Sequence, residues 1–383
     1  MKKPLEGLLV LEFSQFLAGP SAGLRLADLG ARVIKIERPV KGEGGRQIAI
    51  KNIFIDGDSL VFHTINRNKE SYAADLKNAD DLEKVKKLIA KADVMTHNFR
   101  PGVMEKIGLD YASVKTINSK IVYGIVSGYG NKGPWANKPG QDLLVQSLSG
   151  LTHLSGTRND GPVPFGLAVA DILCGSHFTQ GILAGLIKRG KTHESVLVEV
   201  SLLESTLDMQ FEVLTTYLND GGKLPYRGNT RGTAHAYLSA PYGIYKTKDS
   251  YLAIAMGNLI PLMTALGCTI EEAYEDAATW FDKRDEIVET IASVLINTTT
   301  DECLLILEPL GIWCAPVLDY QELMQQEGYK VLGMQQNVKL PNGDDLATTR
   351  CPIVINGRKL YSTKPAPKVG SHTDEINKEF YIL

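Results

Sequence analysis

Short apolar runs, separated by small or polar residues, divide the first part of the chain into alternating strands and helices. Residues 7–13 (G-L-L-V-L-E-F) predict a buried strand, a helix follows through Leu29, and residues 32–36 predict a second strand. Gly30 stands where a helix C-cap glycine belongs. This order is a βαβ unit, which predicts a parallel sheet that binds ligands at the carboxyl ends of its strands.

The same alternation continues to about residue 218. We expect strands at residues 71–77, 94–96, 121–127 and 196–200, and helices at residues 79–92, 103–107, 111–117, 143–149, 171–187 and 202–218. Residues 128–140 are rich in Gly and Pro and have the length of a functional loop. The start of the chain is typical of a Rossmann fold, but G-x-G-x-x-G is missing, so a dinucleotide site has little support.

Beyond residue 220 the pattern changes. The glycine-rich residues 220–231 predict an interdomain linker, and residues 242–255 predict a hairpin with a K-D-S turn that opens a second domain. Helices are expected at residues 258–267, 283–295 and 300–309, a strand at 313–318, and an extended, proline-bearing tail from Tyr329. A chain of 383 residues fits about two domains.

Composition excludes several classes of protein. The 44% hydrophobic and 22% charged residues are typical of a soluble globular protein, and a net charge of −3 gives no support to nucleic-acid binding. No apolar run reaches the roughly 20 residues that span a bilayer, and Glu6 and Glu12 bracket the N-terminal apolar run, which argues against a secretory signal. The five cysteines contain no C-x-x-C pair, so we expect a cytoplasmic protein without disulfides or a metal site.

One acidic residue, Asp171, lies in an otherwise small and apolar stretch, P-V-P-F-G-L-A-V-A-D-I-L-C-G (residues 162–175). Two interpretations are open. Asp171 can be the N-cap of the helix that follows. Alternatively, it is a nucleophile or an acid–base group whose reactivity is raised by desolvation.

Basic residues recur near the predicted strand ends, in K-I-E-R (residues 35–38), N-R-N-K-E-S (66–71) and H-N-F-R-P-G-V-M-E-K-I-G (97–108). They predict either a rim that binds a polyphosphate or ordinary surface charge on α/β loops. His97 is expected to form hydrogen bonds in a loop rather than to act in catalysis. Gln141 and Asp142 stand at a predicted helix start, where Asp142 can serve as a cap.

Eight ordered motifs run through the first 220 residues: P-L-E-G-L-L-V-L-E-F, L-A-G-P, L-A-D-L-G-A-R-V-I-K-I-E-R-P, N-R-N-K-E-S, N-F-R-P-G-V-M-E-K-I-G-L-D-Y, V-S-G-Y-G-N-K-G-P, Q-D-L-L-V-Q-S-L-S-G-L and V-A-D-I-L-C-G. Together they resemble the class III CoA-transferase family, which includes formyl-CoA transferase, crotonobetainyl-CoA:carnitine CoA-transferase and, as a divergent branch, alpha-methylacyl-CoA racemase. The resemblance resumes at R-G-N-T and A-P-Y-G-I-Y and is looser beyond residue 245.

The resemblance implies an α/β fold with a large Rossmann-like parallel-sheet domain that contains both termini and a smaller inserted α+β domain. The large domain would comprise residues 1–220, completed by about 330–383, and the small domain residues 221–330. Two subunits would interlock as a homodimer. Asp171 falls on the catalytic aspartate of the family, which attacks an acyl-CoA to give a mixed anhydride and then an aspartyl-CoA thioester.

Acyl-CoA and a small carboxylic acid are therefore the expected substrates, and coenzyme A is expected as a substrate rather than a permanent cofactor. The family motifs place coenzyme A against Ala18, Arg38, Leu76, Lys77, Asn98, Phe99, Arg100 and Lys106. They place the acid substrate near Gln15, Gln141, Asp142, Gly257 and Asn258.

Three positions depart from the family. Gln141 replaces the histidine of the racemase branch and cannot shuttle a proton at neutral pH, which argues against a racemase. Residues 255–261 (A-M-G-N-L-I-P) hold one glycine where formyl-CoA transferase has a glycine-rich loop, and Pro164 replaces an arginine found in many relatives. A racemase or epimerase that abstracts the α-proton, and a CoA-binding protein without turnover, remain as alternatives.

Overall fold

The computed structural model of the protein describes residues 2–382 and divides into two compact units. Unit 1 comprises residues 2–145, 168–209 and 332–382, and unit 2 comprises residues 146–167 and 210–331. The sequence-based division placed residues 146–167 and 210–220 in the first domain, whereas in the structure they pack with the second unit. Arg227, for example, donates hydrogen bonds to the carbonyls of Ser155 and Gly161.

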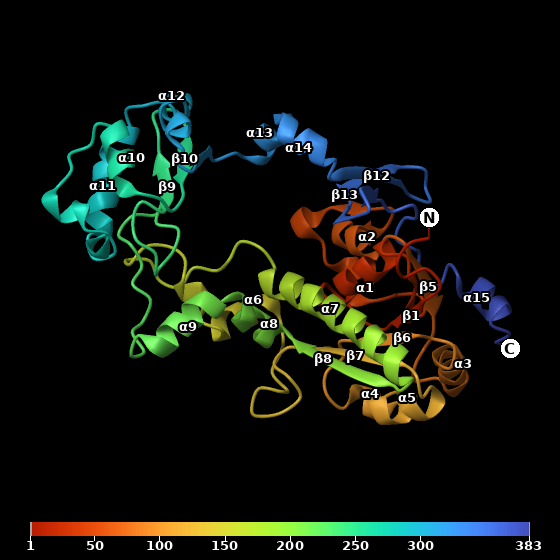
Figure 1. Ribbon diagram of the computed structural model, residues 1–383. Coiled ribbons are helices and arrows are strands. Elements are labelled where there is room, and N and C mark those ends of the chain that lie inside the picture. The colour runs from red at the N-terminus through yellow and green to blue at the C-terminus, as the bar shows by residue number, and fades with distance from the viewer. Residues whose placement is uncertain (1, 383) are drawn as a thin grey trace. The chain divides into compact units, whose positions relative to one another are not determined.

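Unit 1 is built on one sheet of six parallel strands, as the βαβ pattern predicts (Figure 1). In spatial order they are β5 (Lys69–Ala73), β2 (Arg32–Glu37), β1 (Leu9–Glu12), β6 (Val94–His97), β7 (Val122–Ser127) and β8 (Val196–Ser201). The chain grows outward in one direction from β1 to β5 and in the other from β6 to β8. The order therefore reverses between β1 and β6, and at such a switch point α/β sheets bind their ligands.

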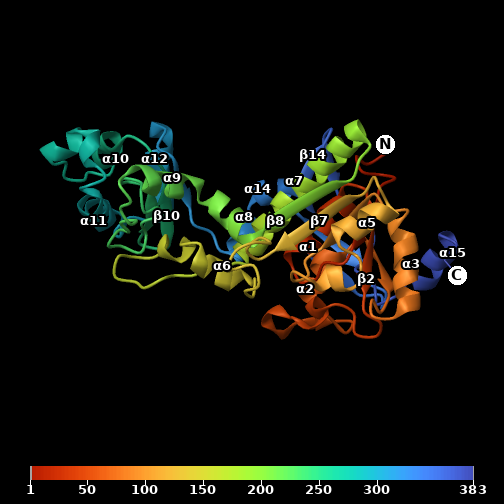
Figure 2. The ribbon, with the colours of Figure 1, turned by 90° about the horizontal axis from the view of Figure 1, so that it is seen from below.

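Alternate side chains of each strand enter the two cores of unit 1. Val10, Val33 and Val122 pack on one face with α1 (Ala18–Asp28) and α7 (Val169–Thr192). Their neighbours, including Leu11, Ile34 and Tyr123, pack on the other face with α3 (Ala79–Ile89), α5 (Tyr111–Ile117) and α15 (Thr373–Glu379), which Figure 2 shows on the side away from α7. Helices on both faces explain why these strands are apolar on both sides.

Several boundaries differ from the sequence-based ones. Strand β5 comprises Lys69–Ala73 rather than residues 71–77, and α7 runs from Val169 to Thr192 rather than from residue 171 to 187. The helix predicted at residues 202–218 is broken at Gln210 into α8 (Leu202–Met209) and α9 (Phe211–Asn219). The tail from Tyr329 is not simply extended, because it also contains α15.

Unit 2 contains an antiparallel sheet of β11 (Cys314–Pro316), β10 (Tyr251–Ile254) and β9 (Gly243–Lys246), which confirms the predicted hairpin and the strand after it. Its core is formed with α10 (Leu259–Ala265), α11 (Arg284–Leu295) and α12 (Thr300–Leu307). The remaining helices are α2 (Leu60–Asn66), α4 (Val103–Lys106), α6 (Asp142–Leu148), α13 (Tyr320–Gln325) and α14 (Glu327–Leu332). The remaining strands are β3 (Phe54–Ile55), β4 (Asp58–Ser59), β12 (Gln335–Lys339), β13 (Asp345–Thr349), β14 (Cys351–Ile355) and β15 (Arg358–Leu360).

The C-terminal segment returns to unit 1 and is bonded to it at several points. Arg67 Nε donates to Ser362 Oγ over 2.6 Å, and the Gly370 N–H donates to Ser71 Oγ over 2.9 Å. Among residues 2–382, no single helix is long and apolar enough to span a membrane; only α11 taken together with residues 300–310, across a bend of 113°, reaches that length and composition.

Candidate functional site

The switch point of the sheet brings together two residues that the sequence singled out. Gln15 follows β1, and Asn98 follows β6. The Gln15 N–H donates to Asn98 Oδ1 over 2.8 Å, and Asn98 Nδ2 donates to the Gln15 carbonyl over 2.7 Å. Both backbone polar groups of Gln15 are thus fixed by one side chain of the neighbouring strand end, and this reciprocal pair joins the two loops where a ligand is expected.

Asp171 is the third residue of α7, which begins at Val169 with Ala168 as its N-cap. The interpretation of Asp171 as the cap is therefore wrong. Its place is set by close packing of α7 on α1, because a Cβ added at Gly175 would lie 2.2 Å from Ser21 Oγ and 2.8 Å from the Ala18 carbonyl. One turn earlier, the Asp171 carboxylate lies near the Ala18 N–H at the start of α1, which lowers the pKa of this carboxylate.

A second carboxylate lies beside the first. Asp142 Oδ2 accepts the N–H of Asp171 over 3.1 Å, so the side chain of α6 satisfies a backbone donor in the first turn of α7. Partial burial and, as a smaller effect, the negative charge of Asp142 together raise the pKa of Asp171 to about 6, while the Ala18 N–H acts in the opposite direction. Asp171 is therefore a poorly solvated carboxylate that is still ionised at neutral pH.

The predicted basic rim is only partly formed. Arg38 is exposed after β2, Arg100 is exposed after β6, and Lys106 is exposed at the end of α4. Lys35 and Lys69 are instead buried and paired with Glu12, at 3.0 and 2.9 Å, because both point inward from their strands. Lys35 is therefore neither a surface charge nor a cation of the rim, and the interpretation of Lys69 as a rim cation is wrong.

The other residues predicted to bind coenzyme A lie at the same edge. Ala18 is buried at the start of α1, Leu76 is partly buried against the core, and Lys77 is exposed after β5. The Phe99 ring stacks on His97, with ring centroids 6.1 Å apart and planes 21° apart.

His97 supports this turn rather than the chemistry. Its Nδ1 accepts the Phe99 N–H over 3.3 Å, and burial lowers the pKa of His97 to about 4, so the ring is neutral at physiological pH. It therefore forms a hydrogen bond, as expected, although it does so as the last residue of β6.

Comparison with known proteins identifies the family. The model of CoA-transferase family III matches residues 5–373 of the chain. The chain belongs to this family.

Named relatives agree. The mouse succinyl-CoA:glutarate CoA-transferase is 32% identical over 98% of this chain and 86% of its own length. The succinate–glutarate CoA-transferase of Agrobacterium fabrum is 31% identical over 100% of this chain and 97% of its own. A crystal structure of a CAIB/BAIF family protein from Brucella suis superposes with a TM-score of 0.83 at 31% identity, covering 99% of this chain and 100% of that one. The protein is thus a class III CoA-transferase, an enzyme that acts on an acyl-CoA and a carboxylic acid.

Three residues predicted for the acid substrate of this CoA-transferase have other surroundings. Gln141 is exposed just before α6, and its carbonyl accepts the Val145 N–H. Gly257 and Asn258 belong to unit 2, where Asn258 Oδ1 caps α10 by accepting the Ile260 N–H over 3.1 Å. Their contact with substrate remains a prediction.

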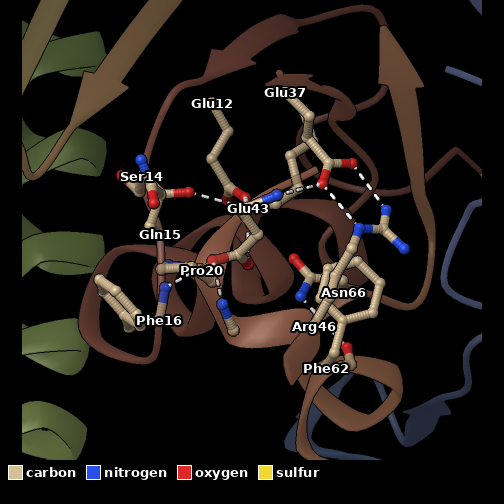
Figure 3. A network of polar contacts seen from close by, with 12 residues as sticks. Glu12, Ser14, Gln15, Phe16, Pro20, Glu37, Glu43, Arg46, Phe62 and Asn66 are labelled. Atoms are coloured by element: carbon tan, nitrogen blue, oxygen red, sulfur yellow. Dashed lines mark hydrogen bonds and ion pairs between the residues drawn. The ribbon is translucent and has the colours of Figure 1, made fainter. Parts of the chain in front are cut away.

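A buried group of charged residues in the CoA-transferase escaped sequence reasoning. Figure 3 shows the carboxylates of Glu12, Glu37 and Glu43 gathered in one network next to the loop that carries Gln15 and Phe16. The available signal was the presence of charged residues inside apolar strands, in V-L-E-F and V-I-K-I-E. Among residues 2–382, no three His, Cys, Asp or Glu side chains are placed to hold a metal ion.

Proposed function

We propose that this enzyme moves CoA from an acyl-CoA donor to a free carboxylic acid with Asp171 as the covalent nucleophile. The observation that carries the proposal is the half-buried Asp171 carboxylate, placed between Asp142 and the Ala18 N–H beside the switch point of the sheet. A weak nucleophile such as a carboxylate needs a poorly solvated site and a donor for the developing oxyanion. Both are present at Asp171.

The proposed reaction has four steps. The Asp171 carboxylate attacks the thioester carbonyl, the C–S bond breaks, and a mixed anhydride and the CoA thiolate are formed. The thiolate attacks the Asp171 carbonyl carbon of the anhydride and releases the first acid, which leaves an aspartyl-CoA thioester. The incoming carboxylate attacks this thioester to give a new anhydride and the thiolate. The thiolate then takes the new acyl group and frees Asp171.

We propose a short dicarboxylic acid as the acceptor and succinyl-CoA as the first donor to test. The support comes from relatives of 31–32% identity that are named for succinyl-CoA, succinate and glutarate. The exposed Arg38, Arg100 and Lys106 are proposed to contact the phosphates of coenzyme A. Arg38 and Arg100 follow the carboxyl ends of β2 and β6, and Lys106 is the last residue of α4, the helix after β6.

The covalent intermediate gives a direct test. Purified enzyme is mixed with succinyl-CoA without an acceptor, quenched and digested, and the peptide with Asp171 is examined by mass spectrometry. The expected result is a CoA adduct on Asp171 that disappears when glutarate is added. Absence of an adduct with every donor, together with full activity of Asp171→Asn, would refute the nucleophile.

The pH dependence offers an independent prediction. Because only the ionised Asp171 can attack, kcat/KM for the acyl-CoA is expected to rise as pH increases through about 6. Asp142→Asn removes the neighbouring negative charge, so the pKa of Asp171 falls and the rising limb moves to lower pH. A limb at the same pH in Asp142→Asn would show that Asp142 does not act on Asp171 electrostatically.

The racemase alternative predicts a different isotope pattern. With an α-branched acyl-CoA in deuterated water, a racemase introduces deuterium at the α-carbon without transferring CoA. We expect no such label above the buffer control, because Gln141 has no titratable proton to deliver from the opposite side. Labelling at the rate of turnover would favour proton abstraction over CoA transfer.

We also propose that the protein acts as an interlocked homodimer. Helix α9 supports a partner of some kind, since none of its residues is buried and Phe211, Leu214 and Leu218 form one apolar stripe, with exposed fractions of 63%, 37% and 69%. Light scattering coupled to size-exclusion chromatography is expected to give twice the 41.9 kDa chain mass, and a monomer mass would contradict the dimer.

A further inference from the structure

Four charged side chains are buried together beneath the loop that follows β1. Glu12 and Lys35 have exposed fractions of 0%, Lys69 of 1% and Glu43 of 4%. Lys35 Nζ lies 3.0 Å from Glu12 Oε1 and 3.2 Å from Glu43 Oε1, and Lys69 Nζ lies 2.9 Å from both oxygens of Glu12. Two positive and two negative charges therefore balance within this four-residue cluster.

Such a cluster is a poor way to stabilise a fold. Removing each ion from water costs several kcal/mol, and apolar side chains of similar volume are often as stabilising as a buried ion pair. What the cluster does provide is a set of directed hydrogen bonds to the backbone, which apolar side chains cannot supply.

The cluster forms hydrogen bonds to the backbone on both sides of Ala18. Lys35 Nζ donates to the Ser14 carbonyl over 2.8 Å, and Glu43 Oε2 accepts the Phe16 N–H over 2.8 Å. Lys69 Nζ donates to the Pro20 carbonyl over 2.8 Å. Residues 14–20 are thus held at three backbone positions, and the Ala18 N–H, which lowers the pKa of Asp171, lies between them in the chain.

The loop has a conformation that its own residues disfavour. Phe16 has φ of 68°, in the left-handed region, which costs a non-glycine residue about 1–2 kcal/mol. Its side chain is 49% exposed, so burial of the ring does not explain the strain. Gly44 leaves room for it, because an added Cβ would lie 2.8 Å from the Phe16 ring. The hydrogen bond from Phe16 to Glu43 is the contact that fixes this conformation.

We propose that Glu43 is a positioning residue of the transfer reaction, which, with its charge balanced by Lys35, holds residues 14–17 so that the Ala18 N–H faces the reacting carboxyl of Asp171. Gln15 lies between the bonded residues Ser14 and Phe16, and its own backbone is bonded to Asn98 across the switch point. This inference rests on the proposed role of Asp171 as nucleophile. The Ala18 N–H would then meet the oxyanion that develops on the Asp171 side of the anhydride and thioester.

Two double variants separate positioning from stability. Lys35→Met/Glu43→Leu removes both charges and the acceptor for the Phe16 and Gly45 N–H groups, and Lys35→Met/Glu43→Gln removes both charges but keeps an acceptor. In each, Glu12 and Lys69 still balance one another. Neither variant leaves a buried unpaired charge, so their melting temperatures are expected to be similar and close to that of the wild type.

Asp28→Asn serves as the control for loss of a buried carboxylate. Asp28 has an exposed fraction of 1% and bonds to Arg25 at 2.9 Å and to Asn68 at 3.1 Å, and none of its partners belongs to residues 14–18. It is expected to lose stability while its kcat stays within about two-fold of the wild type, since a site placed by other contacts is unaffected.

The proposal predicts a loss in kcat that does not follow stability. For succinyl-CoA and glutarate, Lys35→Met/Glu43→Leu is expected to lose about 100-fold in kcat, the scale of a displaced oxyanion donor. The KM for the acyl-CoA should change by less than about three-fold, because the loop donor acts mainly in the transition state. Lys35→Met/Glu43→Gln should recover most of the loss. Equal kcat in both double variants would overturn the proposal.

Hydrogen exchange tests whether Glu43 holds the Phe16 amide, and it does not depend on enzyme turnover. In Lys35→Met/Glu43→Leu, the Phe16 amide is expected to exchange at least about 10-fold faster than in the wild type, with no such change in Asp28→Asn. An unchanged Phe16 amide would overturn the proposal even if activity fell. If the wild type transferred CoA from no donor, the proposed function would fail, and the exchange data would then show separately whether the charges hold the loop.

Discussion

Replacing Asp171 by asparagine is expected to abolish CoA transfer and, at the same time, to raise the melting temperature at neutral pH. Loss of the nucleophile should reduce kcat by at least about 1,000-fold, because the amide cannot form the anhydride. The folded-state pKa of about 6 lies above the usual 3.8, so the folded protein binds this proton more tightly than the unfolded chain. Its stabilising effect is complete below pH 3.8 and is lost as pH rises through about 6.

At neutral pH the ionised Asp171 is therefore a stability cost, and a neutral side chain of the same shape removes it. Thermal unfolding at neutral pH and at pH near 4 measures the effect, which should be larger at neutral pH. Asp110→Asn is the matched control, since Asp110 caps α5 by accepting the Ser113 N–H over 3.1 Å and its pKa is lowered by hydrogen bonds to Ser113. This control should keep activity and gain no stability. A lower melting temperature in Asp171→Asn would contradict the claim that the ionised Asp171 destabilises the folded protein.

Among the single substitutions described, Gly23→Ala is expected to cause the largest loss of stability. A Cβ at Gly23 would lie 1.7 Å from Glu12 Oε2 and 2.9 Å from its carboxyl carbon. Glu12 cannot retreat, because its oxygens bind Lys35 and Lys69 inside the protein. Either α1 moves away from the sheet or the buried ion pairs break, and breaking one such pair typically costs about 3–5 kcal/mol.

Gly190→Ala in α7 is the matched control, because it is also a helical glycine but an added Cβ meets nothing within 4 Å. Alanine there should be neutral or stabilising by up to about 1 kcal/mol, since glycine is the poorer helix former. Denaturant unfolding of both variants and the wild type measures the difference. A Gly23→Ala protein as stable as Gly190→Ala would show that α1 adjusts freely over Glu12.

The local pattern of apolar residues was sufficient to predict the strands of the sheet that are short apolar runs in the sequence. Strands β1, β2, β6 and β7 fall within the predicted ranges to within one residue, since each is a short apolar run between polar ends. The parallel sheet follows from the βαβ order for the same reason. Helix α15 was missed because only one of its seven residues, Ile376, is buried. Its sequence therefore has no apolar periodicity.

The sequence by itself determined the family, through ordered motifs that lie along the chain, and it marked Asp171 as the one acid in an apolar stretch. Only the tertiary structure decided that Asp171 lies in the first turn of α7 rather than at its cap, and that Asp142, 29 residues away, faces it. Likewise Lys69 can be buried because its ammonium group is paired with the carboxylate of Glu12, 57 residues away. A pattern of neighbours predicts whether a residue suits a strand or a helix, but the solvation of a charge depends on partners that only folding brings close.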